Sequence, residues 1–264
     1  MPTAHVNGID VFYERGGDGP RLLFCNGSFA TLATSAMLVD VFRGRFDTVA
    51  HDQRGLGRTE IPPGPYSMGD YAADALALAD HVGWDTFRLV GISFGGMVAQ
   101  EIAVTAPERI ERLALLCTSP GGEGGSSYPM HELREMDPAE RAEVSRRIMD
   151  TRFTPEWLAE HPADRMFVEG LANRPGVAPG SEAERGEREQ AAARAHHDVW
   201  DRLARITCPT LVASGRYDGI APLANGEAIA SRIPGAELRV YEGGHGFFAQ
   251  DRKAFPEVLD FLAG

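Results

Sequence analysis

Short, uninterrupted runs of apolar residues recur along the chain and predict strands that are covered on both faces. Segments with helical periodicity lie between them, bounded by residues that favour helix ends, at 68–81, 97–105 and 223–232. Because strand and helix alternate, we expect a mostly parallel sheet with helices on both of its faces. The apolar runs that define these strands are 22–25, 48–51, 87–92, 113–117, 210–213 and 238–241.

The beginning of the chain has a different pattern. Residues 5–15 alternate between apolar and polar around Asn7-Gly8, and both positions of this dipeptide tolerate the positive φ of a two-residue hairpin turn. We therefore predict two antiparallel strands here, which bring the sheet to eight strands.

The segment from 121 to 205 contains no convincing strand pattern. Its residues are helical and polar, with acidic and arginine side chains interleaved, which is typical of solvated helix faces. We expect a helical cap, residues 121–205, inserted after the sixth strand of an α/β core that comprises residues 1–120 and 206–264.

The composition narrows the class of protein. The chain has 264 residues, 43% of them hydrophobic, which is enough for a full globular core. Its 38 acidic residues outnumber 26 basic ones, and the net charge of −12 repels phosphate backbones and anionic lipid surfaces. We therefore expect neither a nucleic-acid partner nor a membrane partner. The oligomeric state is left open.

The cysteines and the first residues bear on location. Cys25, Cys117 and Cys208 stand singly, so neither a disulfide framework nor a zinc site is predicted. No basic and apolar leader begins the chain, and no apolar run approaches the length of a membrane span. We expect a cytoplasmic protein.

The sharpest chemical signal is the sequence Gly91-Ile92-Ser93-Phe94-Gly95, which follows a predicted strand and precedes a predicted helix. In this context the G-x-S-x-G pattern forms a tight, strained turn that exposes the serine hydroxyl as a nucleophile. The alternative is a glycine-rich connection with an incidental serine. The strand and helix on either side favour the nucleophile.

A serine nucleophile needs a base and a group that orients the base, in the chain order serine, acid, histidine. Asp218 and His245 each follow a predicted strand, at the edge where parallel sheets assemble their sites. Glycines flank His245 on both sides and suit a backbone that approaches another segment closely. The alternative for His245 is a loop histidine without a chemical role.

Other polar residues are interpreted as structural. The adjacent His196 and His197 have no cysteine or carboxylate at ligand spacing, so we expect a solvated pair rather than a metal site. The loop from Asp52 to Thr59 lacks the phosphate-loop spacings and is interpreted as a turn with an Asp–Arg scaffold. Arginines between 121 and 205 could bind a substrate carboxylate, but solvated helix faces account for them more simply; they are Arg146, Arg147, Arg152 and Arg165.

These motifs in this order resemble the α/β-hydrolase family, from Leu22 to the end of the chain. Asn26-Gly27-Ser28 stands where the family has His-Gly-x, and residues 52–59 match its D-x-R-G-x-G-x-S/T loop. Residues 91–118 and 152–157 more narrowly resemble 3-oxoadipate enol-lactonases and related small esterases and lactonases.

The resemblance implies a serine hydrolase that cleaves a carboxylic ester or a lactone without a metal or cofactor. Ser93 would attack the carbonyl, His245 would accept its proton, and Asp218 would orient the imidazole. The backbone N–H groups of Ser28 and Phe94 would form the oxyanion hole. Apolar residues between 121 and 205 are expected mainly in the core of the cap. The residues expected to line the substrate pocket are Asn26, Phe29, Met130, Phe153, Trp157 and Phe247.

Three alternatives remain open at this point. A carbon–carbon bond hydrolase or a cofactor-free perhydrolase would use the same three residues, because the pocket rather than the nucleophile selects the reaction. A non-catalytic ligand receptor on the same scaffold would not need to keep all three. The intact set of serine, acid and histidine favours an enzyme.

Overall fold

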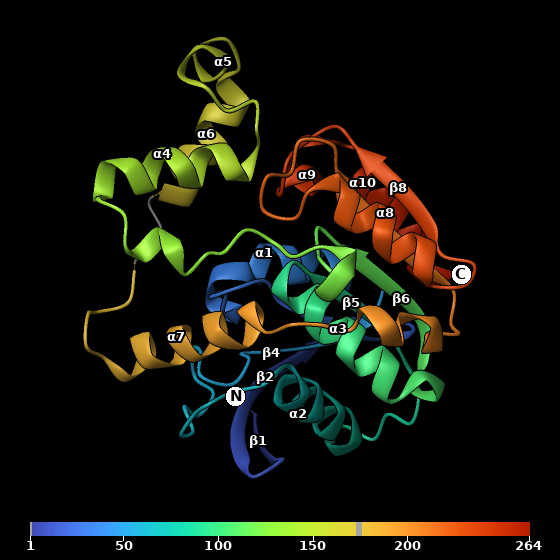
Figure 1. The fold of residues 1–264 in the computed structure, drawn as a ribbon. Helices are drawn as coiled ribbons and strands as arrows, with labels where there is room; N and C mark the ends of the chain where they lie inside the picture. Colours follow the sequence, from blue (N-terminus) through green and yellow to red (C-terminus); the bar gives the residue numbers. More distant parts are fainter. Residues whose placement is uncertain (1, 173–175) are drawn as a thin grey trace.

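A computed structural model describes residues 2–172 and 176–264 and contains a single eight-stranded sheet (Figure 1). The spatial order of its strands is β1-β2-β4-β3-β5-β6-β7-β8. The predicted eight-stranded, mostly parallel sheet is confirmed. The strands are β1 (Thr3–Val6), β2 (Ile9–Gly16), β3 (Arg21–Cys25), β4 (Asp47–His51), β5 (Phe87–Ile92), β6 (Ile110–Leu116), β7 (Thr210–Gly215) and β8 (Glu237–Tyr241).

Antiparallel pairing is confined to the first part of the chain. β1 pairs with β2 and β2 pairs with β4 in antiparallel register, and all other pairs are parallel. Asn7 and Gly8 have φ values of 49° and 78°, as the predicted hairpin turn requires. The hairpin is therefore confirmed.

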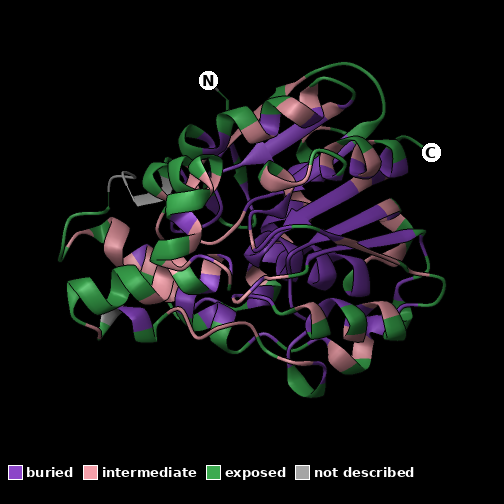
Figure 2. Ribbon diagram, turned by 90° about the horizontal axis from the view of Figure 1, so that it is seen from above, coloured by how far each residue is buried: buried purple, intermediate pink, exposed green. Residues whose placement is uncertain are grey.

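Two hydrophobic layers cover the two faces of the sheet (Figure 2). Successive residues of β3 illustrate the alternation: Leu22 and Phe24 pack with helices α1 (Leu32–Arg43) and α10 (Ala254–Ala263). Leu23 and Cys25 point to the other face, where α2 (Met68–His81), α3 (Phe94–Thr105) and α8 (Leu223–Arg232) supply the partners. This arrangement leaves the carboxyl ends of the parallel strands as the edge at which loops can meet.

Two of the predicted helices have the predicted limits, and one begins earlier. α2 and α8 span 68–81 and 223–232 as expected, and Ser67 caps α2 through a reciprocal capping box with Asp70. α3 begins at Phe94 rather than at residue 97, because the chain turns directly from Ser93 into the helix. Gly95 and Gly96 are therefore helical residues.

The connection between β6 and β7, residues 121–205, is called the helical segment below. Its α-helices are α4 (Pro138–Met149), α5 (Pro155–Glu160), α6 (Pro162–Ala172) and α7 (Glu182–Ala195). It contains no strand among the residues that the structure describes, only an isolated bridge between Gly121 and Asp198. Residues 173–175 lie outside the described residues. Figure 1 shows α4, α5 and α6 grouped together at one end of the molecule.

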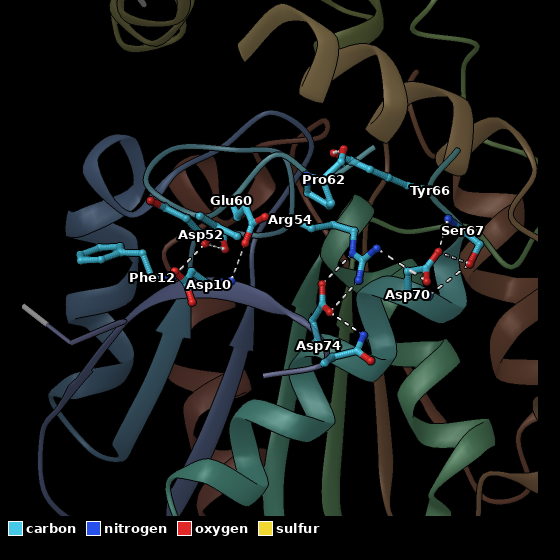
Figure 3. Close-up of polar contacts among 12 residues, drawn as sticks. Asp10, Phe12, Asp52, Arg54, Glu60, Pro62, Tyr66, Ser67, Asp70 and Asp74 are labelled. Atoms are coloured by element: carbon cyan, nitrogen blue, oxygen red, sulfur yellow. Dashed lines mark hydrogen bonds and ion pairs between the residues drawn. The ribbon is translucent and has the colours of Figure 1, made fainter. Parts of the chain in front are cut away.

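The loop from Asp52 to Thr59 is held by a buried ion pair (Figure 3). The Arg54 guanidinium donates from Nε and Nη2 to the two carboxylate oxygens of Asp74 in α2, each at 2.7 Å. Asp52 instead accepts backbone N–H groups from Leu32 and Arg58. The expected Asp–Arg scaffold thus joins the loop to α2, a connection that the loop sequence alone does not reveal.

Candidate active site

Ser93 lies at the turn between β5 and α3 with a strained backbone, φ 56° and ψ −116°. Non-glycine residues rarely adopt positive φ, and such residues gather where function requires them. Close packing explains the neighbouring glycines: a Cβ at Gly91 would overlap the carbonyl of Gly95, and a Cβ at Gly95 would overlap that of Cys25. The sharp turn and the tight contact of α3 with β3 together present the hydroxyl at the edge of the sheet.

His245 connects Ser93 with Asp218. Its Nε2 lies 2.9 Å from Ser93 Oγ, and its Nδ1 lies 2.8 Å from Asp218 Oδ2. The other carboxylate oxygen, Asp218 Oδ1, accepts the backbone N–H groups of Ile220 and Ala221, each at 2.8 Å. Asp218 is therefore a fixed acceptor that orients the imidazole toward the serine. The structure brings together the three residues that the sequence singled out.

The helical segment braces the loops that carry Asp218 and His245. At the end of α4, the carbonyl of Met149 accepts the N–H of His245 at 2.6 Å, and that of Ile148 accepts the N–H of Gly219 at 2.9 Å. The N–H of Thr151 donates to the carbonyl of Tyr217 at 2.9 Å. The acid and the base thus come from the core, while their loops are fixed by backbone contacts with the helical segment.

The loop after β3 brings Ser28 to the same edge. Asn26 stabilises this loop, because its Oδ1 accepts the N–H of Gly27 and its Nδ2 donates to Ser35 Oγ. The next residue, Phe29, has a positive φ of 59° and donates its N–H to Gln190 Oε1 of α7 at 2.7 Å. Neither the N–H of Ser28 nor that of Phe94 donates to an acceptor within the described residues. Both groups are available to a ligand beside Ser93.

A cleft of about 500 Å³ opens above Ser93 and His245 and is lined largely by apolar side chains. Three of the six predicted pocket residues line it, namely Asn26, Phe29 and Met130. Other apolar residues on its walls are Met37, Leu38, Val41, Met149, Phe167, Ile220, Phe248 and Phe255. Helix α1, the helical segment and the C-terminal residues 246–255 therefore all contribute apolar surface that a substrate would meet.

The other three predicted pocket residues are corrected by the structure, since none of them lines the cleft. Phe153 is fully buried. Trp157 donates its indole N–H to Asp164 and stacks on His161 within the helical segment. Phe247 packs face to face with Tyr241 beneath the loop of His245. Aromatic residue type did not distinguish a cleft wall from a packed interior.

Three polar residues of the helical segment are also buried near the site, and none was predicted there. Gln190 and Arg194 lie four residues apart on the inner face of α7, and His197 follows at its end. His196 is exposed, but His197 is buried, so the expectation of a solvated pair is wrong for His197. Burial lowers the pKa of His197 to about 4. The four-residue spacing from Gly186 through Gln190 to Arg194, among alanines, was the available signal of a buried polar face.

Within residues 2–172 and 176–264, no cluster of three or more histidine, cysteine, aspartate or glutamate side chains is placed to hold a metal ion. In the same part of the chain, no helix has the length and apolar character needed to cross a membrane.

Comparison with known proteins identifies the fold family. A model of the alpha/beta hydrolase fold matches residues 20–251. The chain belongs to the α/β-hydrolase family. This α/β-hydrolase is 30% identical to 3-oxoadipate enol-lactonase 2 of Acinetobacter baylyi over 246 residues, 92% of this chain and 88% of that protein. The predicted resemblance to this family and to its enol-lactonases is confirmed.

Two further relatives extend the comparison. A protein of Azorhizobium caulinodans that carries the name carbamate hydrolase is 27% identical to this α/β-hydrolase over 261 residues, 98% of this chain and 97% of that protein. The crystal structure of the enol-lactonase from Burkholderia xenovorans covers 100% of both chains with a TM-score of 0.80 at 24% identity, which shows a shared fold.

Proposed function

We propose that this α/β-hydrolase cleaves a small carboxylic ester or lactone through Ser93, His245 and Asp218. The observation that carries the proposal is the continuous hydrogen-bonded chain from Ser93 Oγ through His245 to Asp218, at the floor of an apolar cleft. A receptor would have no need for a strained serine hydrogen-bonded to an oriented imidazole.

In the proposed reaction, Ser93 Oγ attacks the carbonyl carbon while its proton passes to His245 Nε2. Asp218 stabilises the resulting imidazolium and keeps Nδ1 protonated. The bond to the leaving alcohol breaks as His245 returns the proton to that oxygen, which leaves an acyl group on Ser93. Water then attacks the acyl-enzyme, with His245 again as the base, and the carboxylic acid is released.

The developing oxyanion would be stabilised by the backbone N–H groups of Ser28 and Phe94. One belongs to the residue after the nucleophile and the other to the loop after β3, and neither donates to an acceptor in the described part of the chain. Donors fixed in this way before the reaction stabilise charge in the transition state without rearrangement.

The substrate class is proposed from the cleft and from the relatives. Its apolar walls suit a hydrocarbon body attached to the reacting carbonyl. The enol-lactonase relatives favour an ester or lactone carbonyl. The relative named as a carbamate hydrolase makes a carbamate the comparison substrate in any assay panel.

Active-site labelling tests the nucleophile directly. A fluorophosphonate should add once to the wild-type protein, at Ser93, and the Ser93→Ala variant should lose both the label and hydrolysis of p-nitrophenyl butyrate. Intact-mass spectrometry that shows unchanged labelling of Ser93→Ala would reject the assignment. A folded wild-type protein that neither reacts with the probe nor hydrolyses any ester, lactone or carbamate would support the receptor instead.

A further inference from the structure

The cleft wall contains a buried guanidinium without a carboxylate partner. Arg194 of α7 is only 7% exposed, and no carboxylate of the described residues lies within ion-pair distance of it. Its Nη1 donates to the carbonyl of Tyr128 at 2.7 Å, and this is its one hydrogen bond to the described residues. Its Nε is buried, with no hydrogen-bond partner among the residues that the structure describes.

Such an arrangement is unfavourable for the free protein, because a buried charge is normally paired. Burial lowers the pKa of Arg194 to about 10, and Asp218 is the carboxylate that opposes this shift. Asp218 cannot complete the site, since its oxygens already accept from His245 and from two backbone N–H groups. The guanidinium still carries its charge at neutral pH.

The position of Arg194 connects it with the reacting groups. It lines the same cleft as Ser93 and His245. It also lines a smaller adjoining cavity of about 120 Å³, whose other polar residues are Ser119, Ser126, Ser127, His131 and His197. His197 is itself buried there. Arg194 therefore lies between the cleft and a second cavity that is lined in part by polar side chains.

We propose that Arg194 binds a carboxylate carried by the substrate, so that the natural ester or lactone is an anion with an apolar body. This inference rests on the proposed function, because it assigns a substrate class to the same cleft. The carboxylate would supply the counter-ion that the described residues do not provide, with charge-assisted hydrogen bonds to the N–H groups of the guanidinium. The apolar walls would receive the remainder of the molecule.

Matched substrates test the proposal. One set pairs aryl half-esters of dicarboxylic acids with fatty-acyl esters of the same chain length, so that a carboxylate replaces a terminal methyl group on the acyl side. A second set makes the same exchange on the alcohol side of butyrate esters. The wild-type protein should prefer the anion, by kcat/KM, in one of the two sets. Arg194→Gln should lower the ratio of anionic to neutral kcat/KM on the order of tenfold to a hundredfold.

Two further variants separate binding of the anion from a structural role. Arg194→Lys keeps the charge and should restore part of the preference. Arg188→Gln removes an exposed arginine of the same helix, paired with Glu184, and should leave the ratio unchanged. A purely structural Arg194 would instead lower Tm and reduce the rates with both substrates equally.

Failure of the carboxylate site can be distinguished from failure of the proposed hydrolase function. If esters are hydrolysed through Ser93 but neither set shows a preference for the anion, the proposed carboxylate site is wrong while the hydrolase stands. If Arg194→Gln does not fold, competitive inhibition of the wild type decides: a dicarboxylate should inhibit hydrolysis of p-nitrophenyl butyrate at least tenfold better than its neutral diamide. Equal inhibition by the two would overturn the proposal.

Discussion

The strands at the centre of the molecule are buried along most of their length, whereas α4 and α5 of the helical segment are mostly exposed (Figure 2). All six residues of β7 are buried, and so is every residue of α3 except Thr105. Ile148 is the buried residue of α4 and Leu158 that of α5. A substitution in the core therefore disturbs many contacts, while the helical segment can change its surface at little cost.

This difference suggests that the core and the helical segment have different roles in the reaction. Ser93, Asp218 and His245 lie on loops of the core at one edge of the sheet, and backbone contacts with the end of α4 brace the loops of Asp218 and His245. The cleft walls and the buried Arg194 come partly from the helical segment. We infer that the core sets the reaction and that the helical segment selects the substrate. The predictions below test these two roles with variants in each region.

The largest effect is expected from removal of the base in the core. His245→Ala deletes the group that accepts the Ser93 proton, and kcat should fall on the order of ten-thousandfold or more. Steady-state hydrolysis of p-nitrophenyl butyrate measures the loss, with Tm as the control for folding. A His245→Ala protein with wild-type kcat/KM would require another base.

A smaller loss is expected from the oxyanion loop. Ser28→Pro removes the backbone N–H and should lower kcat on the order of a hundredfold or more. Ser28→Ala keeps the N–H and should change kcat little, since Ser28 Oγ has no hydrogen-bond partner among the described residues. Measurement of Tm distinguishes a lost donor from a misfolded loop. A severe loss in Ser28→Ala at unchanged Tm would show that the hydroxyl itself contributes.

The third prediction concerns stability in the helical segment. Burial is the main cause that lowers the pKa of His197, to about 4. A hydrogen bond with the backbone of Ser119 and the charge of Asp198 oppose this shift, and the charges of Arg202 and Arg194 add to it. In the unfolded chain the imidazole of His197 takes up a proton near pH 6.5, whereas in the folded protein it stays neutral until about pH 4. The folded state is therefore favoured fully above pH 6.5, and the free energy of unfolding falls as the pH is lowered toward 4. Between pH 6.5 and 4 the expected loss in the free energy of unfolding is roughly 3 kcal/mol.

Denaturant unfolding at a series of pH values tests the sign and the size of this effect. The His197→Gln variant should lose less stability than the wild type between pH 6.5 and 4, whatever its stability at pH 7. Parallel pH dependences of the two proteins would show that His197 does not keep a lowered pKa in the folded state.

The smallest effect is expected where the two regions meet. Gln190 of α7 accepts the N–H of Phe29 and so helps to position the loop that carries Ser28. Gln190→Leu removes this acceptor and should lower kcat about tenfold with little change in KM. Gln190→Glu keeps an acceptor oxygen and should recover most of the loss. Unchanged kcat in Gln190→Leu would show that the contact between Gln190 and Phe29 does not position the loop of Ser28.

The sequence was sufficient for the core because its signals are local. Apolar runs and helix ends predict the sheet and the limits of α2 and α8, and Asn7-Gly8 predicts the hairpin. The proximity of Ser93, Asp218 and His245 also follows from chain order, since parallel strands end at one edge of the sheet. The start of α3 was placed too late, because the close packing of Gly95 against β3 involves a residue distant in the chain.

The helical segment depended on the tertiary structure. Phe153, Trp157 and Arg194 each allow a surface, interior or cleft position by residue type, and only the packing of the helices against the core selected one. His197 and Gln190 likewise became buried through contacts with residues distant in the chain. The sequence by itself determined the elements, the hairpin and the order of the serine, acid and histidine, because periodicity, turn chemistry and strand order are properties of the chain. The tertiary structure decided which side chains face the cleft, and that Arg194 among them is buried without a carboxylate partner in the described part of the chain, because burial depends on neighbours that come together only in the folded protein.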